Sequence, residues 1–259
     1  NPPQTYDDML RIADAITADR PELTAFTWPG AKEESLVMVF SDFLHGFGGS
    51  YRDADANYAF DSEEAVAALG FMKRLIDEGY SPQETTAWRG EESRRRFVEG
   101  NAIFTWHNSD LVTWLDDPER SGIAGNWEFT TTPAQEDGEA VGITGGFAFG
   151  TNPHSDSPDA AGKVLEAIAS EPVQKGFAMA WGPVQYYDGL YEQDEVLEAN
   201  PNSDKITEVL DSAISRPPST SYSELSSILQ EEIHTALTGG KAPRQALEDA
   251  TARIQRLRQ

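Results

Sequence analysis

Hydrophobic positions recur at intervals of three and four residues through most of this chain, which is the spacing of amphipathic helices. The segment 36–46 is apolar nearly all round, so we expect a buried helix there. The first predicted helix is capped by Thr5 or Asp7 and has apolar positions from Met9 to Ile16. A later helix follows a capping box at 61–64 and ends at Gly79, and a terminal helix buries Ala246, Leu247, Ala250, Ile254 and Leu257. The remaining predicted helices, besides 36–46, span 91–99, 158–170, 171–180, 206–214 and 223–237.

Strand-like segments are fewer and shorter. NAIFTW (101–106) and WEFTTT (127–132) are rich in β-branched and aromatic residues. The segment 138–153, GEAVGITGGFAFGTNP, has the same character, and its paired glycines predict a core strand with a bulge or a close backbone approach. The segment 182–204 is predicted to be mostly loop. Short strands separated by helices predict an α/β fold whose sheet is partly supplied by distant segments.

Composition limits the classes of partner. The chain has 259 residues, of which 39% are hydrophobic, and this is typical of a folded protein. Its net charge of −24 argues against nucleic acid and anionic membrane surfaces as partners, because phosphates would be repelled. Six lysines accompany fourteen arginines, and few lysines among many acids suit a protein that lives in high salt.

Residues that could carry catalytic or metal chemistry are scattered. The chain has no cysteine, and its four histidines form no HExxH pair, so we expect no metal and no cofactor. Neither a GxSxG, a Walker loop nor a dinucleotide fingerprint occurs. The sequence shows no apolar run long enough to cross a bilayer and no signal peptide, so if the protein is exported, its targeting segment was removed or lies outside this sequence.

Five segments, in order along the chain, carry a family resemblance. They are NPPQTYDDMLRIADAI, FDSEEAVAALGFMKRLIDEGYSP, SRRRFVEGNAIFTWHNSDLVTW, SPDAAGKVLEAIASEPVQKGFAMAWGPVQYYDGLY and RPPSTSYSELSSILQEEIHTALTGGKAPRQALEDATARIQRL. Together they resemble the extracellular solute-binding proteins that deliver sugars to ABC importers, the maltose-binding-protein-like family. The departure is at the front, where this family has a signal and a βαβ-rich part of the first lobe.

The resemblance implies a helix-rich, two-lobed α/β fold of the type II periplasmic-binding-protein kind, with the first lobe incomplete. Residues 1–144 would form the main part of the second lobe, and 145–215 the remaining part of the first lobe with hinge crossovers at its ends. Residues 216–259 would supply closing helices packed on the second lobe. The implied function is that of a non-catalytic, monomeric receptor, extracellular or periplasmic, anchored to the membrane through a missing N-terminal segment. It would close around an oligosaccharide and deliver it to the permease subunits.

The first candidate ligand-binding group follows the predicted strand 101–106. Trp106, Asn108, Ser109 and Asp110 place an aromatic ring, an amide, a hydroxyl and a carboxylate where open α/β sheets usually expose ligands. Sugars need this mixture, because their C–H faces pack on flat rings while their hydroxyls both donate and accept hydrogen bonds. The alternative is that Trp106 belongs to the core and Asp110 caps the next helix.

Two further groups are placed at crossovers between the lobes by the resemblance. Gly145, Gly146 and Phe147 form one, in which Phe147 serves either as a stacking platform or as a core aromatic. Arg216 and Tyr222 form the other. The planar donors of Arg216 could bind sugar hydroxyls, or bind a carboxylate that locks the hinge.

Glu34 is a further candidate, because it opens the buried helix and a helix N-terminus presents unpaired N–H groups. The same residue serves the main rival interpretation, a secreted glycoside hydrolase that uses a carboxylate pair such as Glu34 and Asp110. A second rival is a helical adaptor whose acidic face binds a basic partner.

Overall fold

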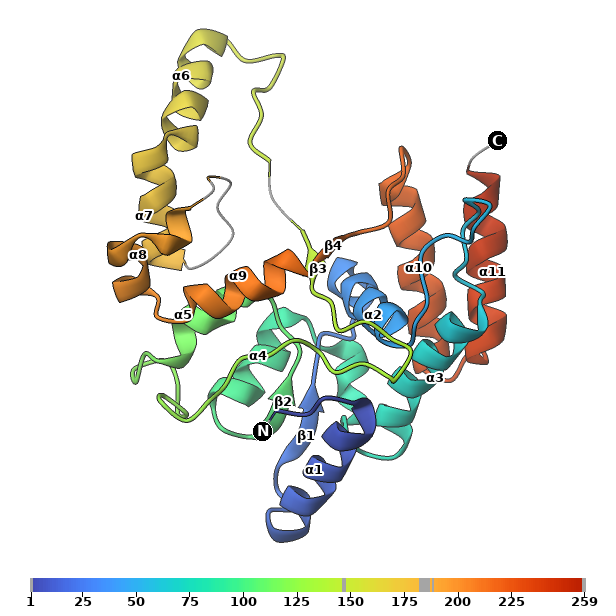
Figure 1. Cartoon of the computed structure of the whole chain (residues 1–259). Coiled ribbons are helices and arrows are strands. Elements are labelled where there is room, and N and C mark those ends of the chain that lie inside the picture. Colours follow the sequence, from blue (N-terminus) through green and yellow to red (C-terminus); the bar gives the residue numbers. More distant parts are fainter. Residues whose placement is uncertain (1, 146–147, 182–186, 188, 258–259) are drawn as a thin grey trace.

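The computed structural model describes the chain except for residues 1, 146–147, 182–186, 188 and 258–259. The main body (Figure 1) begins with α1 (Tyr6–Asp19), β1 (Thr24–Thr27) and α2 (Glu34–Gly46). It continues with α3 (Glu63–Asp77), η1 (Gln83–Ala87), α4 (Gly90–Val98), β2 (Ala102–Thr105), η2 (Ser109–Leu111) and α5 (Val112–Leu115). Two long helices near the C-terminus, α10 (Tyr222–Leu237) and α11 (Pro243–Arg256), complete this body.

Local signals set several of the helix ends. The Thr5 hydroxyl accepts a hydrogen bond from the Asp8 backbone N–H, so Thr5, one of the two predicted caps, is confirmed. The cap of α3 is Ser62, whose hydroxyl accepts from the Ala65 N–H, one residue after the start of the predicted capping box at 61–64. Gly79 and Gly100 follow α3 and α4 with φ angles of 82° and 77°, a left-handed conformation that glycine adopts at low cost. Capping chemistry in the sequence therefore determines these boundaries.

The core lies between α2, α3, α10 and α11, with β1 and α1 beside it. Phe40, Phe43 and Leu44 of α2 are fully buried, as expected for a helix that is apolar nearly all round. Strands β1 and β2 pair in parallel, with Thr27 opposite Thr105, so their carboxyl ends lie at the same edge. The chain leaves that edge toward α2 after β1, and it enters the first candidate group (106–110) after β2.

A second helical unit projects away from this body (Figure 1). It consists of α6 (Pro158–Ala169), α7 (Glu171–Trp181), η3 (Leu190–Glu192), α8 (Asp194–Ala199) and α9 (Ser203–Asp211). The chain leaves the body through β3 (Ile143–Thr144) and returns through β4 (Ile214–Ser215), and these two strands pair in parallel. All residues of α6 are described and none of them is buried. Large exposed apolar side chains gather in this part of the chain: Phe149, Val164, Val173 and Met179.

Four predictions about local structure are wrong. Segment 127–132 is irregular, because strand-like composition yields a strand only where a neighbour takes up its backbone hydrogen bonds. Within 138–153 the described strand is only the two-residue β3, and Phe149 is 67% exposed, so a core strand does not form there. The predicted loop 182–204 contains η3 and α8, and α9 begins at Ser203 and stops before β4. Leu257, expected in the core, is exposed.

The close approach of α1 and α2 generates a stability prediction. A methyl group added at Gly46 would lie 1.9 Å from the Tyr6 hydroxyl oxygen, and Tyr6 is fully buried. We expect Gly46→Ala to lower the free energy of unfolding by about 1–3 kcal/mol through overpacking. At Gly70 of α3 nothing lies within 4 Å, so Gly70→Ala should raise it by up to about 1 kcal/mol. Urea unfolding of both variants checks that the free energy of unfolding falls in Gly46→Ala and rises in Gly70→Ala. Equal changes in the two variants would contradict the packing argument.

Candidate functional site

One face of α2 connects the candidate groups. Glu34, Met38 and Asp42 lie at positions i, i+4 and i+8 of this helix, so they share a face. Glu34 contacts the segment that follows β4, Met38 lies beside Gly145, and Asp42 bonds Trp106. Residues from three distant parts of the sequence therefore line a single helix.

The carboxylate of Glu34 accepts hydrogen bonds from three side chains. Arg216 Nη1 donates to Oε1 at 2.8 Å, the Tyr222 hydroxyl donates to the same oxygen, and the Ser226 hydroxyl donates to Oε2. The Arg216 guanidinium also lies 5.3 Å from the centre of the Tyr222 ring. These contacts join the start of α2 to the β4–α10 connection and to α10 itself.

The electrostatics of this network reinforce its bonding pattern. Burial, followed by the hydrogen bond to Glu34, raises the pKa of Tyr222, so the phenol remains a donor. The hydrogen bond to Glu34 also raises the pKa of Arg216. Of the two roles predicted for Arg216, the structure contains the contact with a carboxylate.

A hollow of about 450 Å³ adjoins this network, a volume in the range of small-molecule sites. Its lining residues are Thr144, Gly145, Ser215, Arg216, Pro217, Pro218, Ser219 and Tyr222. A methyl group at Gly145 would make ordinary van der Waals contacts, 3.6 Å from Arg216 Nη2 and 3.7 Å from Met38 Cε, so this glycine lies against both side chains. The hollow thus lies where the chain passes between the two units of the fold.

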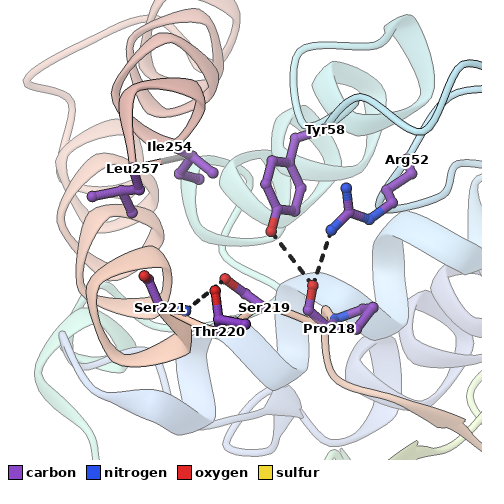
Figure 2. Close-up of a pocket in the computed structure, with 8 residues that line it drawn as sticks. All are labelled: Arg52, Tyr58, Pro218, Ser219, Thr220, Ser221, Ile254 and Leu257. Atoms are coloured by element: carbon purple, nitrogen blue, oxygen red, sulfur yellow. Dashed lines mark hydrogen bonds between the residues drawn. The ribbon is translucent and has the colours of Figure 1, made fainter. Parts of the chain in front are cut away.

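A second hollow, of about 420 Å³, adjoins the connection between β4 and α10, and Figure 2 shows the residues that line it. Arg52 Nη2 donates to the Pro218 carbonyl oxygen at 3.0 Å, and the Tyr58 hydroxyl donates to it at 3.4 Å. The Arg52 guanidinium lies 4.2 Å from the centre of the Tyr58 ring. These bonds fix the proline turn that carries Arg216.

Trp106 is half-buried and packs partly against the main core. Its indole Nε1 donates to Asp42 Oδ2 at 2.6 Å, and the Thr132 hydroxyl donates to the same oxygen at 2.9 Å. Asp42 is only 4% exposed, and this burial raises its pKa to about 7 although both hydrogen bonds lower it. The indole is therefore held by a hydrogen bond at Nε1 while the residue remains partly exposed.

The other members of the first group lie immediately beyond Trp106. The side chains of Asn108 and Asp110 are exposed, and Ser109 is half-buried. Asn108 is the residue that precedes η2, and Asp110 lies inside this short helix, so the alternative that Asp110 caps it is wrong. The Nε2 atom of His107 lies 3.1 Å from the Gly90 carbonyl oxygen, and this hydrogen bond ties the stretch to α4.

The structure brings Glu34, Gly145, Arg216 and Tyr222 together, whereas Asn108, Ser109 and Asp110 belong to a separate stretch at the end of β2. Gly146 and Phe147 lie outside the described residues. Sequence reasoning missed Asp42, Thr132 and Ser226. One signal for Asp42 was present, because it is the lone acid inside the apolar segment 36–46.

Metal-binding and membrane-spanning features are absent from the part of the chain that the structure describes. There, histidine and acidic side chains form no group of three that could hold a metal ion. None of the described helices combines the length and the apolar character needed to span a bilayer.

Comparison with known proteins matches residues 1–175 to the family described as bacterial extracellular solute-binding protein. A curated relative from Deinococcus radiodurans, described as a probable ABC transporter-binding protein, is 25% identical over 265 residues, which cover 99% of this chain and 63% of the relative.

Solved structures are similar over nearly the whole chain. Maltose-bound MalE3 from T. maritima is 29% identical with a TM-score of 0.93, covering 99% of this chain and 66% of that one. The cyclic alpha-maltosyl-1,6-maltose binding protein from Arthrobacter globiformis is 25% identical with a TM-score of 0.72, covering 99% and 65%. The chain thus spans about two thirds of the length of these relatives. The predicted helix-rich fold of the type II periplasmic-binding-protein kind is confirmed.

The network around Glu34 generates a second stability prediction. Three donors make charge-assisted bonds to this partly exposed carboxylate. We expect Glu34→Gln to lower the free energy of unfolding by about 1–2 kcal/mol, because the loss of the charge weakens all three bonds. Screening by solvent keeps the loss within this range. Glu63 is a matched control, since its ion pair with Arg244 is exposed and Glu63→Gln should change stability little. Denaturant unfolding of both variants tests this. Equal losses would show that the Glu34 network stabilises the fold no more than an exposed ion pair does.

Proposed function

Because the chain belongs to the family of bacterial extracellular solute-binding proteins, we propose that it forms part of a carbohydrate receptor that delivers sugar to an ABC importer. The relatives support this proposal, since one is described as ABC transporter-binding and two bind maltose or a cyclic maltosyl-maltose. The family description supports an extracellular or periplasmic location and permease subunits as partners. We further propose that the protein is a monomer anchored to the membrane.

The observation that carries the proposal is the hollow beside Gly145, Arg216 and Tyr222. It combines a guanidinium, a phenol ring and serine hydroxyls, and a sugar needs both hydrogen-bonding groups and flat apolar surface. Because Glu34 takes one Arg216 donor and the Tyr222 hydroxyl, a sugar would bond to the remaining guanidinium N–H groups and to the serine hydroxyls. In this proposal Trp106, Asn108, Ser109 and Asp110 supply further contacts from the end of β2.

The two short parallel strands β3 and β4 support a hinge between lobes. Residues 1–144 and 216–259 would form the second lobe, and 145–215 would belong to the first. A ligand that contacts both lobes only in the closed state favours closure by that differential contact, which is a shift in population. The permease would then distinguish the closed surface from the open one.

The bonding of Glu34 favours binding over catalysis. A glycoside hydrolase needs one carboxylic acid that gives its proton to the leaving group and a second carboxylate across the sugar. Both Glu34 oxygens instead accept hydrogen bonds, from Arg216, Tyr222 and Ser226. This is the arrangement of an acceptor that holds neighbouring segments in place, so we propose a non-catalytic receptor.

Calorimetric titration with maltose, maltotriose and laminaribiose, in dilute and in molar salt, tests the proposal. We expect saturable binding without hydrolysis, weakened on the order of tenfold or more in Trp106→Ala because a stacking surface is lost. Trp127→Ala is the matched control, since its indole also bonds an aspartate, Asp116, at 2.6 Å but packs in a separate small cluster with Leu111 and Leu115.

Three results would contradict the proposal. Equal loss in the two tryptophan variants would remove Trp106 from the site. Release of shorter sugars would favour the glycoside hydrolase. Silence toward sugars together with binding to a basic protein that weakens steeply with salt would favour the acidic adaptor.

A further inference from the structure

One carboxyl oxygen joins three segments of the main body. Asp42 Oδ2 accepts from the Trp106 indole at the end of β2 and from the Thr132 hydroxyl in the irregular segment 127–132. Asp42 itself lies in the second half of α2, where its neighbours in the helix are apolar. The orientation of the half-buried indole is therefore set by one acid inside the core.

The groups that face Asp42 leave its charge uncompensated. The phenols of Tyr6 in α1 and Tyr51 after α2 lie near enough for Asp42 to raise the pKa of each, as a smaller cause beside burial. His45, one turn further along α2, has its pKa lowered by burial and raised less by Glu139. Among the ion pairs of the described residues, none involves Asp42.

The carboxyl group can therefore change its protonation near neutral pH. Its pKa of about 7 in the folded protein lies above its ordinary value of 3.8, because burial disfavours the charge. The folded state binds more protons than the unfolded chain between these values, so this group makes stability fall as pH rises from about 4 to about 7. Above that range the ionised carboxylate bonds both donors more strongly, since charge-assisted bonds are shorter than neutral ones.

We propose that Asp42 is a positioning residue for Trp106, and that gain or loss of its proton changes how the indole is held at the ligand-binding surface. A flat ring contributes to sugar binding through the face that it presents, so a change in its attachment changes affinity. This consequence for ligands rests on the proposed function, whereas the coupling between Asp42 and Trp106 does not.

Tryptophan fluorescence without any sugar tests the coupling. We expect the emission of the full chain to titrate between pH 5 and 9 with a midpoint near 7, and the change to be absent in Trp106→Phe and in Asp42→Asn. The asparagine keeps an oxygen that accepts both hydrogen bonds. Asp116→Asn is the matched control, because Asp116 bonds Trp127 at the same 2.6 Å but is exposed, and it should leave the titration intact. A titration that persists in Asp42→Asn would overturn the proposal.

A second variant tests the assignment of the titration to Asp42 by the direction in which the midpoint moves, not by the loss of the titration. The Thr132 hydrogen bond lowers the pKa of Asp42, so Thr132→Val should move the fluorescence midpoint to higher pH. An unmoved or lowered midpoint would mean that another group titrates.

Maltotriose titrations at pH 5.5 and 8.5 separate this inference from the proposed function. We expect the dissociation constant of the wild type to differ at least threefold between the two pH values and that of Asp42→Asn to stay constant. Equal wild-type affinities would overturn the positioning role while leaving the receptor in place. No binding of maltotriose at either pH, with the fluorescence titration present, would count against the proposed function and leave the coupling of Asp42 to Trp106 supported.

Discussion

Burial of α2 is the constraint on which the rest of the structure depends. An acidic side chain on a helix surrounded by packed elements is costly to leave without hydrogen-bond partners. Glu34 and Asp42 therefore each accept more than one hydrogen bond, and each bond fixes a segment from elsewhere in the sequence. The same helix that fills the core thus determines where Arg216 and Trp106 lie.

The main body is held by more contacts than its connection to the projecting helices. The Glu34 network attaches the β4–α10 connection to the main body, and Arg52 and Tyr58 hold the following turn through the Pro218 carbonyl. Between the body and the projecting helices, by contrast, the pairing of β3 with β4 covers two residues in each strand. Side-chain hydrogen bonds therefore hold the main body together up to the β4–α10 connection, whereas the strand pairing that joins it to the projecting helices is short.

Sequence patterns predicted the elements whose signals are local. The cap at Thr5, the acidic and serine-containing segment 61–64, the glycine after α3 and the apolar character of α2 were enough to place those helices to within about two residues at their starts. Of the predicted strands, 101–106 is confirmed as β2, but the others were predicted poorly, because a strand is defined by its partner. The four residues of β1 gave too little pattern, and 127–132 has the composition of a strand without forming one.

The candidate site was predictable only in part. Residue chemistry and the family resemblance selected Glu34, Arg216 and Tyr222, but no pattern showed that one carboxylate would bind both of the others. Asp42 and Thr132 were missed because their role is a contact across 64 and 90 positions of the sequence. Helical spacing gives neighbours within α2 but says nothing about which distant segment lies against it.

The apolar side chains that project from residues 149–179 have a colloidal consequence. Phe149, Val164 and Met179 are 67%, 57% and 40% exposed, on a chain with a net charge of −24. At an ionic strength of about 0.1 M the repulsion between like-charged copies acts over about 10 Å and opposes contact between such surfaces. At molar salt that range shrinks to about 3 Å, so attraction between the apolar patches is no longer opposed. The ionic strength that suits an acidic surface is therefore also the one at which copies of this chain would begin to associate.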